Sequence, residues 1–393
     1  MRDYPRSYNE YQSDYPSSFN YCRIDLGALA RNYKRICEFN QGPVMAVVKG
    51  DAYGHGLIPC ARALATAGCQ HFGVLDLEEA RNLGFCGLKA KVTILAGLWG
   101  SIQSIDAVVH SISVFAYDLE QIQTLAQAAG SFMSQAQIWL KIDTGMGRLG
   151  IPWTEMARAI KEAASDQRIK LLGLATHLAT NGDKEAEEQL SRLKMAGEMA
   201  KQYLDGPLLF SATASGGILA HQDFPDDLRR AGLLLYGYSP LEPGDPALQS
   251  NPKAKSLIKS LEPVMTVATR LIQVREAKAG ETISYDRTFK ADKPIRFGTA
   301  PFGYVHGMSR TRSSKGHALI GGRESNLLGR VCMNLTMYEL SGKTGRPGDE
   351  VVLMGRQGKG FIGADLFGSW QQTSAYEILC HLGRSNPRHY VET

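Results

Sequence analysis

Short apolar runs alternate with stretches in which apolar residues recur every three or four positions, from Tyr21 to Tyr236. The runs predict buried strands, and the periodic stretches predict amphipathic helices. Strands are expected at 21–24, 44–48, 71–75, 92–96, 114–117, 137–142, 171–176, 208–211 and 233–236. Helices are expected at 26–38, where Asp25 can cap the first turn, and at 58–67, 101–110, 119–129, 154–164 and 184–203, with another through 78–81.

This part of the chain therefore contains roughly eight strand–helix units in succession. Such a series predicts an α/β fold in which parallel strands form a TIM-type (β/α)8 barrel. A doubly wound sheet is the alternative. The glycine pattern GxGxxG does not follow the first strand, however, and the barrel is favoured.

The pattern changes after Pro243. Residues 242–259 are rich in Pro, Ser and Lys and are expected to form a linker. Short β-rich runs follow at 264–274, 282–284, 329–339 and 350–354, then a helix at 374–382. The basic stretch 310–315 is interpreted as a solvated loop. The predicted organisation is a loose extension at 1–20, a barrel at 21–258 and a mostly antiparallel β domain at 259–393.

Composition is that of an ordinary globular protein, with 393 residues, 44% hydrophobic and 21% charged. The net charge of +5 is small for this length and argues against a dedicated nucleic-acid-binding protein. The seven scattered cysteines lack CxxC or zinc-site spacing, which is typical of reduced thiols in the cytoplasm and predicts no metal site. No apolar run is long enough to span a membrane, and the polar N-terminus does not resemble a secretory signal.

Lys49 ends the apolar run 44–48, and two glycines that frame His55 then predict a tight turn. A lysine at the end of a buried strand is costly to desolvate, so its pKa is expected to fall. A neutral amine can form a Schiff base. The simpler interpretation is a surface lysine, and spacing alone favours that one.

Three more polar segments fall at or near the predicted ends of later strands, and a fourth leads into the last predicted strand. Reactive groups of a barrel gather at the carboxyl ends of its strands. They are KIDTGMGRLG at 141–150, His177, Ser215-Gly216-Gly217 and RRAG at 229–232. Each alone has a structural explanation, because a lone histidine is more often a core residue and Ser-Gly-Gly is a common turn. Together they offer backbone N–H groups at glycine-rich turns, which suit a phosphate, and Tyr53 can add a hydroxyl.

The chain resembles the alanine racemases from about Tyr21 to its end. The resemblance rests on VVKGDAYGHG (47–56), KIDTGMGRLG (141–150), RAGLLLYG (230–237), ISYDRTF (283–289), GRVCM (329–333) and YEILCHLGR (376–384). The first two motifs are highly specific. The family has a pyridoxal-phosphate barrel joined to a β domain, which agrees with the fold predicted above.

The resemblance implies roles for individual residues. Lys49 would form the Schiff base with pyridoxal 5'-phosphate and act as the base on one face of the substrate, and Tyr285 would act on the opposite face. The phosphate would be held by Tyr53, Ser215, Gly232, Leu233 and Tyr376.

Other matching residues would bind the pyridine ring or the substrate. Arg230 would face the pyridine nitrogen, and His177 would link Arg230 to the catalytic tyrosine. Arg148, together with Met333 and Tyr285, would contact the substrate. Supporting roles fall to Tyr304 and to Lys141, a lysine often carbamylated in this family to hold the arginine.

The activity so implied is interconversion of L-alanine and D-alanine, which supplies D-alanine for peptidoglycan. Racemisation needs an acidified Cα–H and an acid/base group on each face. Lysine and tyrosine both start near pKa ~10, so each must be tuned downward to act as a base near neutral pH. An arginine in place of a carboxylate at the pyridine nitrogen is expected to limit transamination. In the family the tyrosine comes from the partner subunit, which implies a homodimer with shared active sites.

Three positions depart from the family pattern. Asn334 stands where Asp is usual, Val305-His306 replaces the Ala-Asp of a GYADG-type loop, and Ala214 precedes Ser215 where Asn is common. Tyr304 of that loop is retained. These changes put the substrate range and the rate in doubt.

Three other functions are alternatives to an alanine racemase. The first is a broad-specificity amino-acid racemase of the same fold, but its periplasmic versions would carry a signal peptide and lack the Lys141 and Leu149 pattern. A decarboxylase with a similar barrel and β domain would keep Lys49 but not KIDTGMGRLG or ISYDRTF. A non-catalytic pyridoxal-phosphate-binding protein would resemble a single barrel of roughly 250 residues, and this chain has about 130 more.

Overall fold

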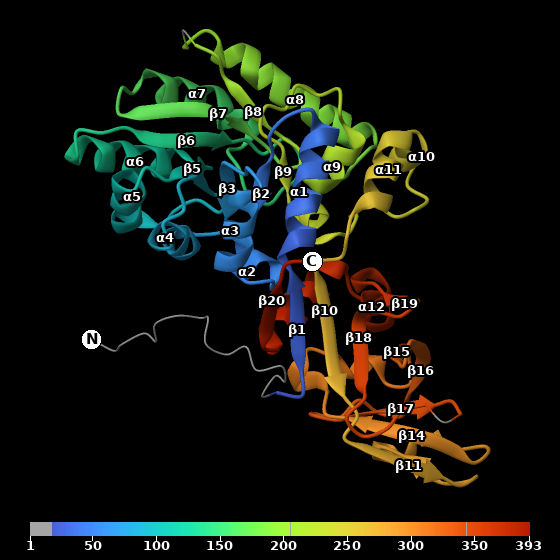
Figure 1. Cartoon of the computed structure of the whole chain (residues 1–393). Helices are drawn as coiled ribbons and strands as arrows, with labels where there is room; N and C mark the ends of the chain where they lie inside the picture. Colours follow the sequence, from blue (N-terminus) through green and yellow to red (C-terminus); the bar gives the residue numbers. More distant parts are fainter. Residues whose placement is uncertain (1–17, 205, 343) are drawn as a thin grey trace, which may run out of the picture. The chain divides into compact units, whose positions relative to one another are not determined.

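A computed structural model describes residues 18–204, 206–342 and 344–393 of the protein (Figure 1). Most of the extension predicted at 1–20 lies outside the described residues. The chain divides into two compact units. The barrel unit contains residues 24–264 and 390–393, and the sheet unit contains residues 265–389 and the described residues up to Arg23.

The barrel unit is built on eight parallel strands in the order β8-β7-β6-β5-β4-β3-β2-β9. Its two edge strands, β8 and β9, approach each other through a bridge between Ala214 and Arg230, so that the barrel is nearly closed. The predicted α/β barrel is confirmed. The strands are β2 (Met45–Val47), β3 (His71–Val74), β4 (Lys91–Ile94), β5 (Ser113–Ala116), β6 (Ala136–Lys141), β7 (Ile169–Ala175), β8 (Leu209–Ser211) and β9 (Arg230–Ala231).

Helices surround these strands, as Figure 1 shows. Four of these helices are capped by an aspartate whose carboxylate accepts the backbone N–H of the residue three positions later. Asp25 caps the first helix in this way, as predicted. The helices are α1 (Leu26–Asn40), α2 (Lys49–Tyr53), α3 (Leu57–Thr66), α4 (Leu77–Phe85), α5 (Gly100–Val109), α6 (Leu119–Ser131), η1 (Trp153–Glu155), α7 (Met156–Ser165), α8 (Lys184–Ala200) and α9 (Ser215–Ala220).

Two predictions for the end of the barrel unit were wrong. Residues 233–236 form the 3-10 helix η2 (Leu233–Tyr236), not a strand, because a short, fully buried apolar run looks the same in either state. The linker expected at 242–259 contains α10 (Pro246–Gln249) and α11 (Pro252–Ser260). Asp245 and Asn251 cap these helices, and each cap is followed by a proline at the first helical position, where proline favours a helix start.

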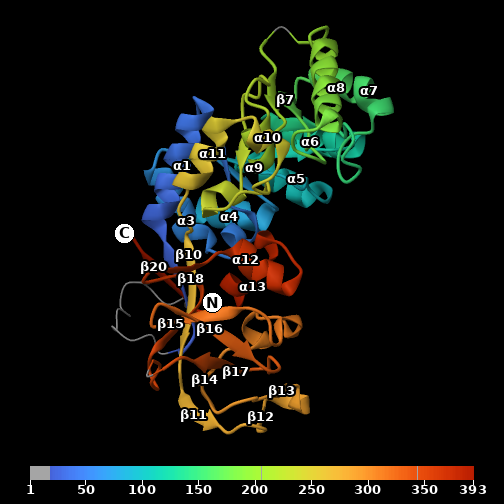
Figure 2. The same cartoon turned by 90° about the vertical axis from the view of Figure 1, so that its right-hand side faces the viewer.

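Helix α11 packs beside α1, as both cartoon views show (Figures 1 and 2). Next to this contact, the fully buried Asn32 amide donates to the carbonyls of Leu235 (3.0 Å) and Glu262 (2.7 Å) and accepts from the Glu262 N–H (2.9 Å). Arg31, and then Arg35, hold the pKa of the Glu262 carboxyl at about 2. Helix α1 is therefore tied to the chain segment that leaves the barrel.

The sheet unit is mostly antiparallel, in the order β11-β14-β17-β16-β15-β18-β10-β1-β20, with β19 beside β18 and a separate β12-β13 pair. Its strands are β1 (Tyr21–Asp25), β10 (Met265–Arg270), β11 (Gln273–Ala277), β12 (Thr282–Ile283), β13 (Phe289–Lys290), β14 (Ile295–Ala300), β15 (His317–Ile320), β16 (Arg323–Leu328), β17 (Thr336–Leu340), β18 (Glu350–Gln357), β19 (Gly360–Ile362) and β20 (Arg388–Val391). Its helices are η3 (Tyr285–Arg287), η4 (Tyr304–His306), η5 (Arg310–Arg312), α12 (Ala364–Gln371) and α13 (Ala375–Ser385).

Two expectations in the sheet unit need correction. The run predicted at 329–339 is a strand only from Thr336 onward. The stretch 310–315 is not simply solvated, because the Arg312 side chain is fully buried. Its guanidinium stacks on Phe367 (4.1 Å) and Trp370 (4.6 Å), and this cation–π contact offsets part of the cost of burying the charge.

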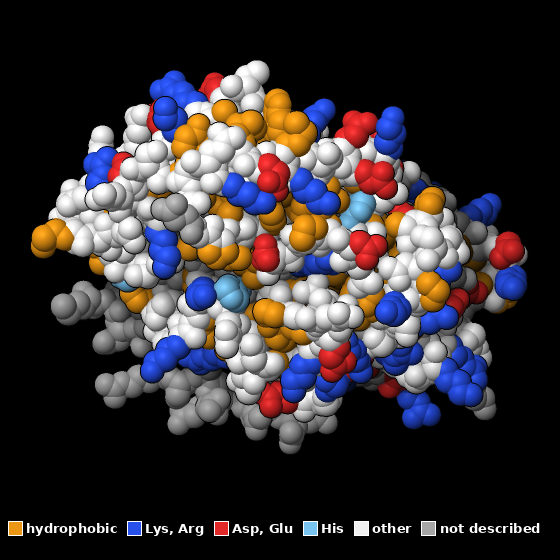
Figure 3. Space-filling view, turned by 90° about the horizontal axis from the view of Figure 1, so that it is seen from above, with side chains coloured by type: hydrophobic (Ala, Val, Ile, Leu, Met, Phe, Trp, Pro, Cys, Tyr) orange, Lys and Arg blue, Asp and Glu red, His pale blue; other side chains and the backbone are white. Residues whose placement is uncertain are grey.

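The seven cysteines, all within the described part of the chain, are thiols rather than disulfides. Figure 3 shows basic and acidic side chains mixed on the face it presents, in line with the small net charge of +5. Among the described residues, none of the helices combines the length and the apolar character that crossing a bilayer requires.

We expect Asn32→Ala to lower the free energy of unfolding by about 2–3 kcal/mol, because it leaves buried backbone groups of Leu235 and Glu262 without partners. Urea denaturation measures this loss. Lys34→Ala, at an exposed position of the same helix, is the control and should change stability little. Equal stabilities of the two variants would contradict the role given to the Asn32 amide.

Candidate active site

Lys49 lies just after β2, separated from it by Val48, whose N–H donates to the Gly73 carbonyl (2.9 Å). The next residues form one turn of left-handed helix, with φ/ψ of 66/39° at Gly50, 58/49° at Asp51 and 53/50° at Ala52, and φ of 53° at Tyr53. Each residue other than glycine costs about 1–2 kcal/mol in this conformation. The predicted tight turn after the lysine is thus a strained one.

Groups suited to a phosphate meet around Gly232. Ser215 Oγ accepts the N–H groups of Gly232 (2.9 Å) and Leu234 (3.4 Å). A Cβ on Gly232 would lie 2.6 Å from the Tyr53 hydroxyl and 3.8 Å from Ser215 Oγ, so only glycine fits between them. The first N–H groups of α9, at Ser215-Gly216-Gly217, lack acceptors within the helix. This set of hydroxyls, N–H groups and glycine fits the phosphate of pyridoxal phosphate, and Leu233 lies buried beside it.

Arg230 is buried and its guanidinium is held by carbonyls at the ends of β7 and β8. Nη1 donates to Ser211 O and Oγ (both 2.7 Å), and Nη2 donates to Thr176 O (2.8 Å) and Ala212 O (3.0 Å). Burial lowers the pKa of Arg230 to about 10, which leaves it cationic near neutral pH.

His177 lies against this guanidinium, with Arg230 Nη2 3.4 Å from its Nδ1. Burial lowers the pKa of His177 to about 2, and the positive charges of Arg230, Lys141, Arg148 and Lys49 add to that effect. His177 is therefore neutral, and Nδ1 can accept a hydrogen bond from Arg230. The four side chains whose charges act on His177 are the two predicted lysines and the two predicted arginines.

Lys141 ends β6 and is almost fully buried. Burial holds its pKa well below the usual range, and the charges of Arg230 and Arg148 act in the same direction. The loop that follows folds back on itself, because Ile151 N–H donates to Lys141 O (2.7 Å) and the Asp143 carboxylate accepts from Gly145 and Gly147 (3.0 and 3.1 Å). This closed loop carries the exposed Arg148.

The remaining predicted residues belong to the sheet unit. Tyr285 opens η3 with 64% of its side chain exposed. Tyr304 opens η4, and the segment is fixed by bonds from Tyr304 N to Cys332 O (3.1 Å) and from Val305 N to Met333 O (3.2 Å). The structure thus places Tyr304 beside Met333. Tyr376 lies in the first turn of α13 and is partly exposed.

The structure also describes the surroundings of three residues that depart from the family pattern. His306 turns toward its own loop, where Nδ1 accepts the Gly303 N–H (3.1 Å) and the ring packs 5.2 Å from that of Phe302. The His306 side chain therefore makes its hydrogen bond within its own loop. Asn334 is exposed next to Met333, and Ala214 caps α9 without a side-chain hydrogen bond.

Sequence reasoning missed three residues that position this site. Gln189 of α8 donates to Thr144 Oγ1 and to His177 O (both 3.2 Å) and accepts from Ala179 N (2.8 Å). Asp226 accepts from the N–H groups of Ala212 (3.1 Å) and Thr213 (2.7 Å) after β8. Glu79 of α4 accepts the Asp51 N–H after Lys49 (3.0 Å). The sequence pattern that could have identified Glu79 is its position three residues after the capping Asp76, which is typical of a capping box.

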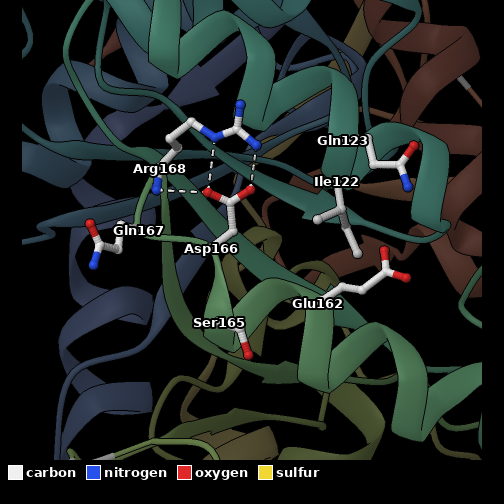
Figure 4. Close-up of a pocket in the computed structure, with 7 residues that line it drawn as sticks. All are labelled: Ile122, Gln123, Glu162, Ser165, Asp166, Gln167 and Arg168. Atoms are coloured by element: carbon white, nitrogen blue, oxygen red, sulfur yellow. Dashed lines mark hydrogen bonds and ion pairs between the residues drawn. The ribbon is translucent and has the colours of Figure 1, made fainter.

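A crevice of about 380 Å³ lies elsewhere in the barrel unit, between α6 and α7 (Figure 4). It contains none of the predicted residues. Asp166 and Arg168, paired at 2.7 Å, precede β7 and so mark the amino ends of the strands, opposite the face at which barrel enzymes react. Within residues 18–204, 206–342 and 344–393, no three His, Cys, Asp or Glu side chains gather as a metal site needs.

Comparison with known proteins adds to this geometry. The family model described as "Alanine racemase, N-terminal domain" matches residues 24–240, and the model described as "Alanine racemase, C-terminal domain" matches residues 264–390. The chain belongs to the alanine racemase family. The alanine racemase of Syntrophobacter fumaroxidans is 34% identical over 375 residues, which cover 93% of this chain and 96% of that protein.

Solved structures of this family share the fold. The alanine racemase from Streptomyces lavendulae superimposes with a TM-score of 0.88 at 28% identity, covering 96% of this chain and 98% of that one. The alanine racemase from Bartonella henselae, solved with covalently bound pyridoxal phosphate, gives a TM-score of 0.83 at 25% identity and covers 96% and 100% of the two chains. The resemblance found in the sequence motifs is confirmed at the level of the family.

The neutral state of His177 predicts a pH effect on stability. Below pH 6.5 the unfolded chain binds a proton that the folded chain excludes, so the folded state loses stability as the pH falls from 6.5 toward 2. We expect wild type to lose about 2 kcal/mol more than His177→Asn between about pH 7 and pH 5. Urea denaturation across this range measures the difference. Parallel curves for the two proteins would contradict it, and His389→Asn, at an exposed histidine, is the control.

Proposed function

We propose that this protein interconverts L-alanine and D-alanine with pyridoxal 5'-phosphate, using Lys49 on one face of the substrate and Tyr285 of the partner subunit on the other. The D-alanine formed would supply peptidoglycan synthesis in the cytoplasm. The observation that carries the proposal is the cluster at the carboxyl ends of the barrel strands, where Arg230 Nη2 lies 3.4 Å from His177 Nδ1, Lys141 ends β6 almost fully buried, and Lys49 lies just after β2. That face is where barrel enzymes react.

The barrel unit contains residues suited to each part of the cofactor. The phosphate would be bound by Ser215, Gly232, Leu233 and Tyr53, and Arg230 would face the pyridine nitrogen. Tyr376, from the sheet unit, would be a further phosphate contact. When bound, pyridoxal phosphate withdraws electrons from the substrate and acidifies its Cα–H. Arg230 stays cationic near neutral pH and its N–H groups are fixed by carbonyl acceptors, so it would donate a hydrogen bond to the ring nitrogen without transferring a proton to it.

The remaining barrel residues suit the amino acid itself. Arg148 would bind the substrate carboxylate, since its closed loop presents an exposed cation. Carbamylation requires a neutral amine, and the lowered pKa of Lys141 favours that form. A carbamate there would place an anion where it can hold Arg148.

The second base is proposed to come from a second copy of the chain. Tyr285 belongs to the sheet unit whereas Lys49 belongs to the barrel unit. Within one chain Tyr285, Tyr304, Val305 and Met333 expose 64%, 44%, 52% and 55% of their side chains. Exposed apolar residues gathered on neighbouring segments are typical of an interface, which supports a homodimer with shared sites.

The direct test is incubation of the purified protein with L-alanine and pyridoxal phosphate, followed by chiral chromatography. We expect approach to an equal mixture of enantiomers by wild type and none by Lys49→Ala, which should also lose the borohydride-reducible cofactor adduct. No D-alanine from wild type would overturn the proposed activity. Faster turnover of other amino acids would favour the broad-specificity racemase.

Tyr285→Phe should lose most activity, by about a hundredfold or more for a lost acid/base group, while still binding the cofactor. If the sites are shared, mixing Lys49→Ala with Tyr285→Phe protein should restore activity, because mixed dimers contain one site with both native residues. Activity measured after subunit exchange tests this. No recovery in demonstrably mixed dimers would contradict the shared site.

A further inference from the structure

The turn after Lys49 is strained, and the chain must hold it in place. Asp51, Ala52 and Tyr53 have φ values of 58°, 53° and 53°, in the left-handed region that residues other than glycine rarely adopt. Ala52 N–H donates to the carbonyl of Val48 (2.7 Å), the residue that follows β2, so the turn begins just beyond the strand. The direction in which Lys49 leaves the strand depends on this turn.

One carboxylate outside the turn bonds to it directly. Glu79 Oε1 accepts the Asp51 N–H (3.0 Å), and Glu79 Oε2 accepts the Leu75 N–H (2.9 Å). Leu75 follows β3, the neighbour of β2 in the barrel. We call this pair of bonds the Glu79 bridge. It joins the segment that leaves β3 to the left-handed turn that leaves β2.

Glu79 is itself well placed by its helix. It is the third residue of α4, and its N–H donates to the carboxylate of the capping Asp76 (3.0 Å). In a capping box the glutamate at this position returns to the N–H of the cap residue. Here the Glu79 side chain instead accepts from Leu75 and from Asp51, which is distant in sequence. On the other side of the turn, Asp51 Oδ1 accepts the Leu57 N–H where α3 begins (2.7 Å).

We propose that Glu79 is a positioning residue for Lys49, which acts by holding the left-handed turn through the Asp51 N–H. This inference rests on the proposed function of Lys49 in binding pyridoxal phosphate. A carboxylate can accept two N–H groups at once, whereas the amide of glutamine has one acceptor oxygen and would point its own N–H at the second donor. Glu79→Gln therefore keeps the shape of the side chain but removes its charge and one of its two acceptor oxygens.

The chain provides a matched control and a rescue. Glu78→Gln makes the same change one residue earlier on α4, at an exposed position. Ala52→Gly places a residue that favours positive φ in the turn. If Glu79 acts by holding the turn, Ala52→Gly should recover part of what Glu79→Gln loses, because the turn then needs less support.

Two measurements on the full-length protein test the proposal. Hydrogen exchange of the cofactor-free protein should show the Asp51 amide exchanging about tenfold faster or more in Glu79→Gln than in wild type. Titration with pyridoxal phosphate, followed by borohydride reduction and mass analysis of the Lys49 peptide, should show affinity weakened by about the same factor. Glu78→Gln should match wild type in both, and Glu79→Gln with Ala52→Gly should lie between.

The outcomes separate this inference from the proposed function. Unchanged exchange at Asp51 and unchanged cofactor affinity in Glu79→Gln would overturn the bridge. Weakened affinity that Ala52→Gly does not relieve at all would overturn the role of the turn. If wild type forms no adduct at Lys49, the proposed function fails, and the exchange data still decide whether the bridge exists. Should Glu79→Gln not fold, Glu79→Asp keeps the charge but shortens the reach, and the same loss at Asp51 is expected.

Discussion

The buried guanidinium of Arg230 is the interaction on which both the barrel and its site depend. The segments of the edge strands β8 and β9 are joined by the Ala214–Arg230 bridge and by backbone bonds such as that from Arg230 N to Thr213 O (3.0 Å). The Arg230 guanidinium adds bonds to Ser211, Ala212 and Thr176 across that seam. A fork of N–H groups can satisfy several carbonyls at strand ends at once, which a lysine could not do. The residue that closes the barrel is thus also the one that presents a fixed positive charge to the site.

That charge has consequences for its neighbours. His177, next to Arg230, is held neutral by burial and by surrounding cations, and Lys141 has a lowered pKa for the same two reasons. Cations placed in a partly buried site favour anions, and the proposed ligands carry a phosphate and a carboxylate. The concentration of positive charge, costly for the empty protein, is therefore suited to the chemistry proposed for it.

Much of this was predictable from the sequence. Alternating strands and helices predicted the barrel, and the motifs around Lys49, Arg148 and Arg230 identified residues that the structure brings to one end of it. What escaped prediction depends on tertiary contacts. The left-handed turn at 50–53 contains only one glycine, and it is held by Glu79 from a different helix. Gln189 bridges two loops that meet only after folding. Prolines at 246 and 252 looked like linker residues but begin helices, because an Asp or Asn cap precedes each.

In the proposed reaction a proton leaves one face of the substrate and another arrives on the opposite face from a different group. Reaction of L-alanine with the protein and pyridoxal phosphate in deuterium oxide tests this, with the isotope at Cα of the D-alanine read by mass spectrometry. We expect D-alanine that carries deuterium at Cα, because the donor on the second face exchanges with solvent. D-alanine that retains the original hydrogen would show that one group carries the same proton across, and would contradict it.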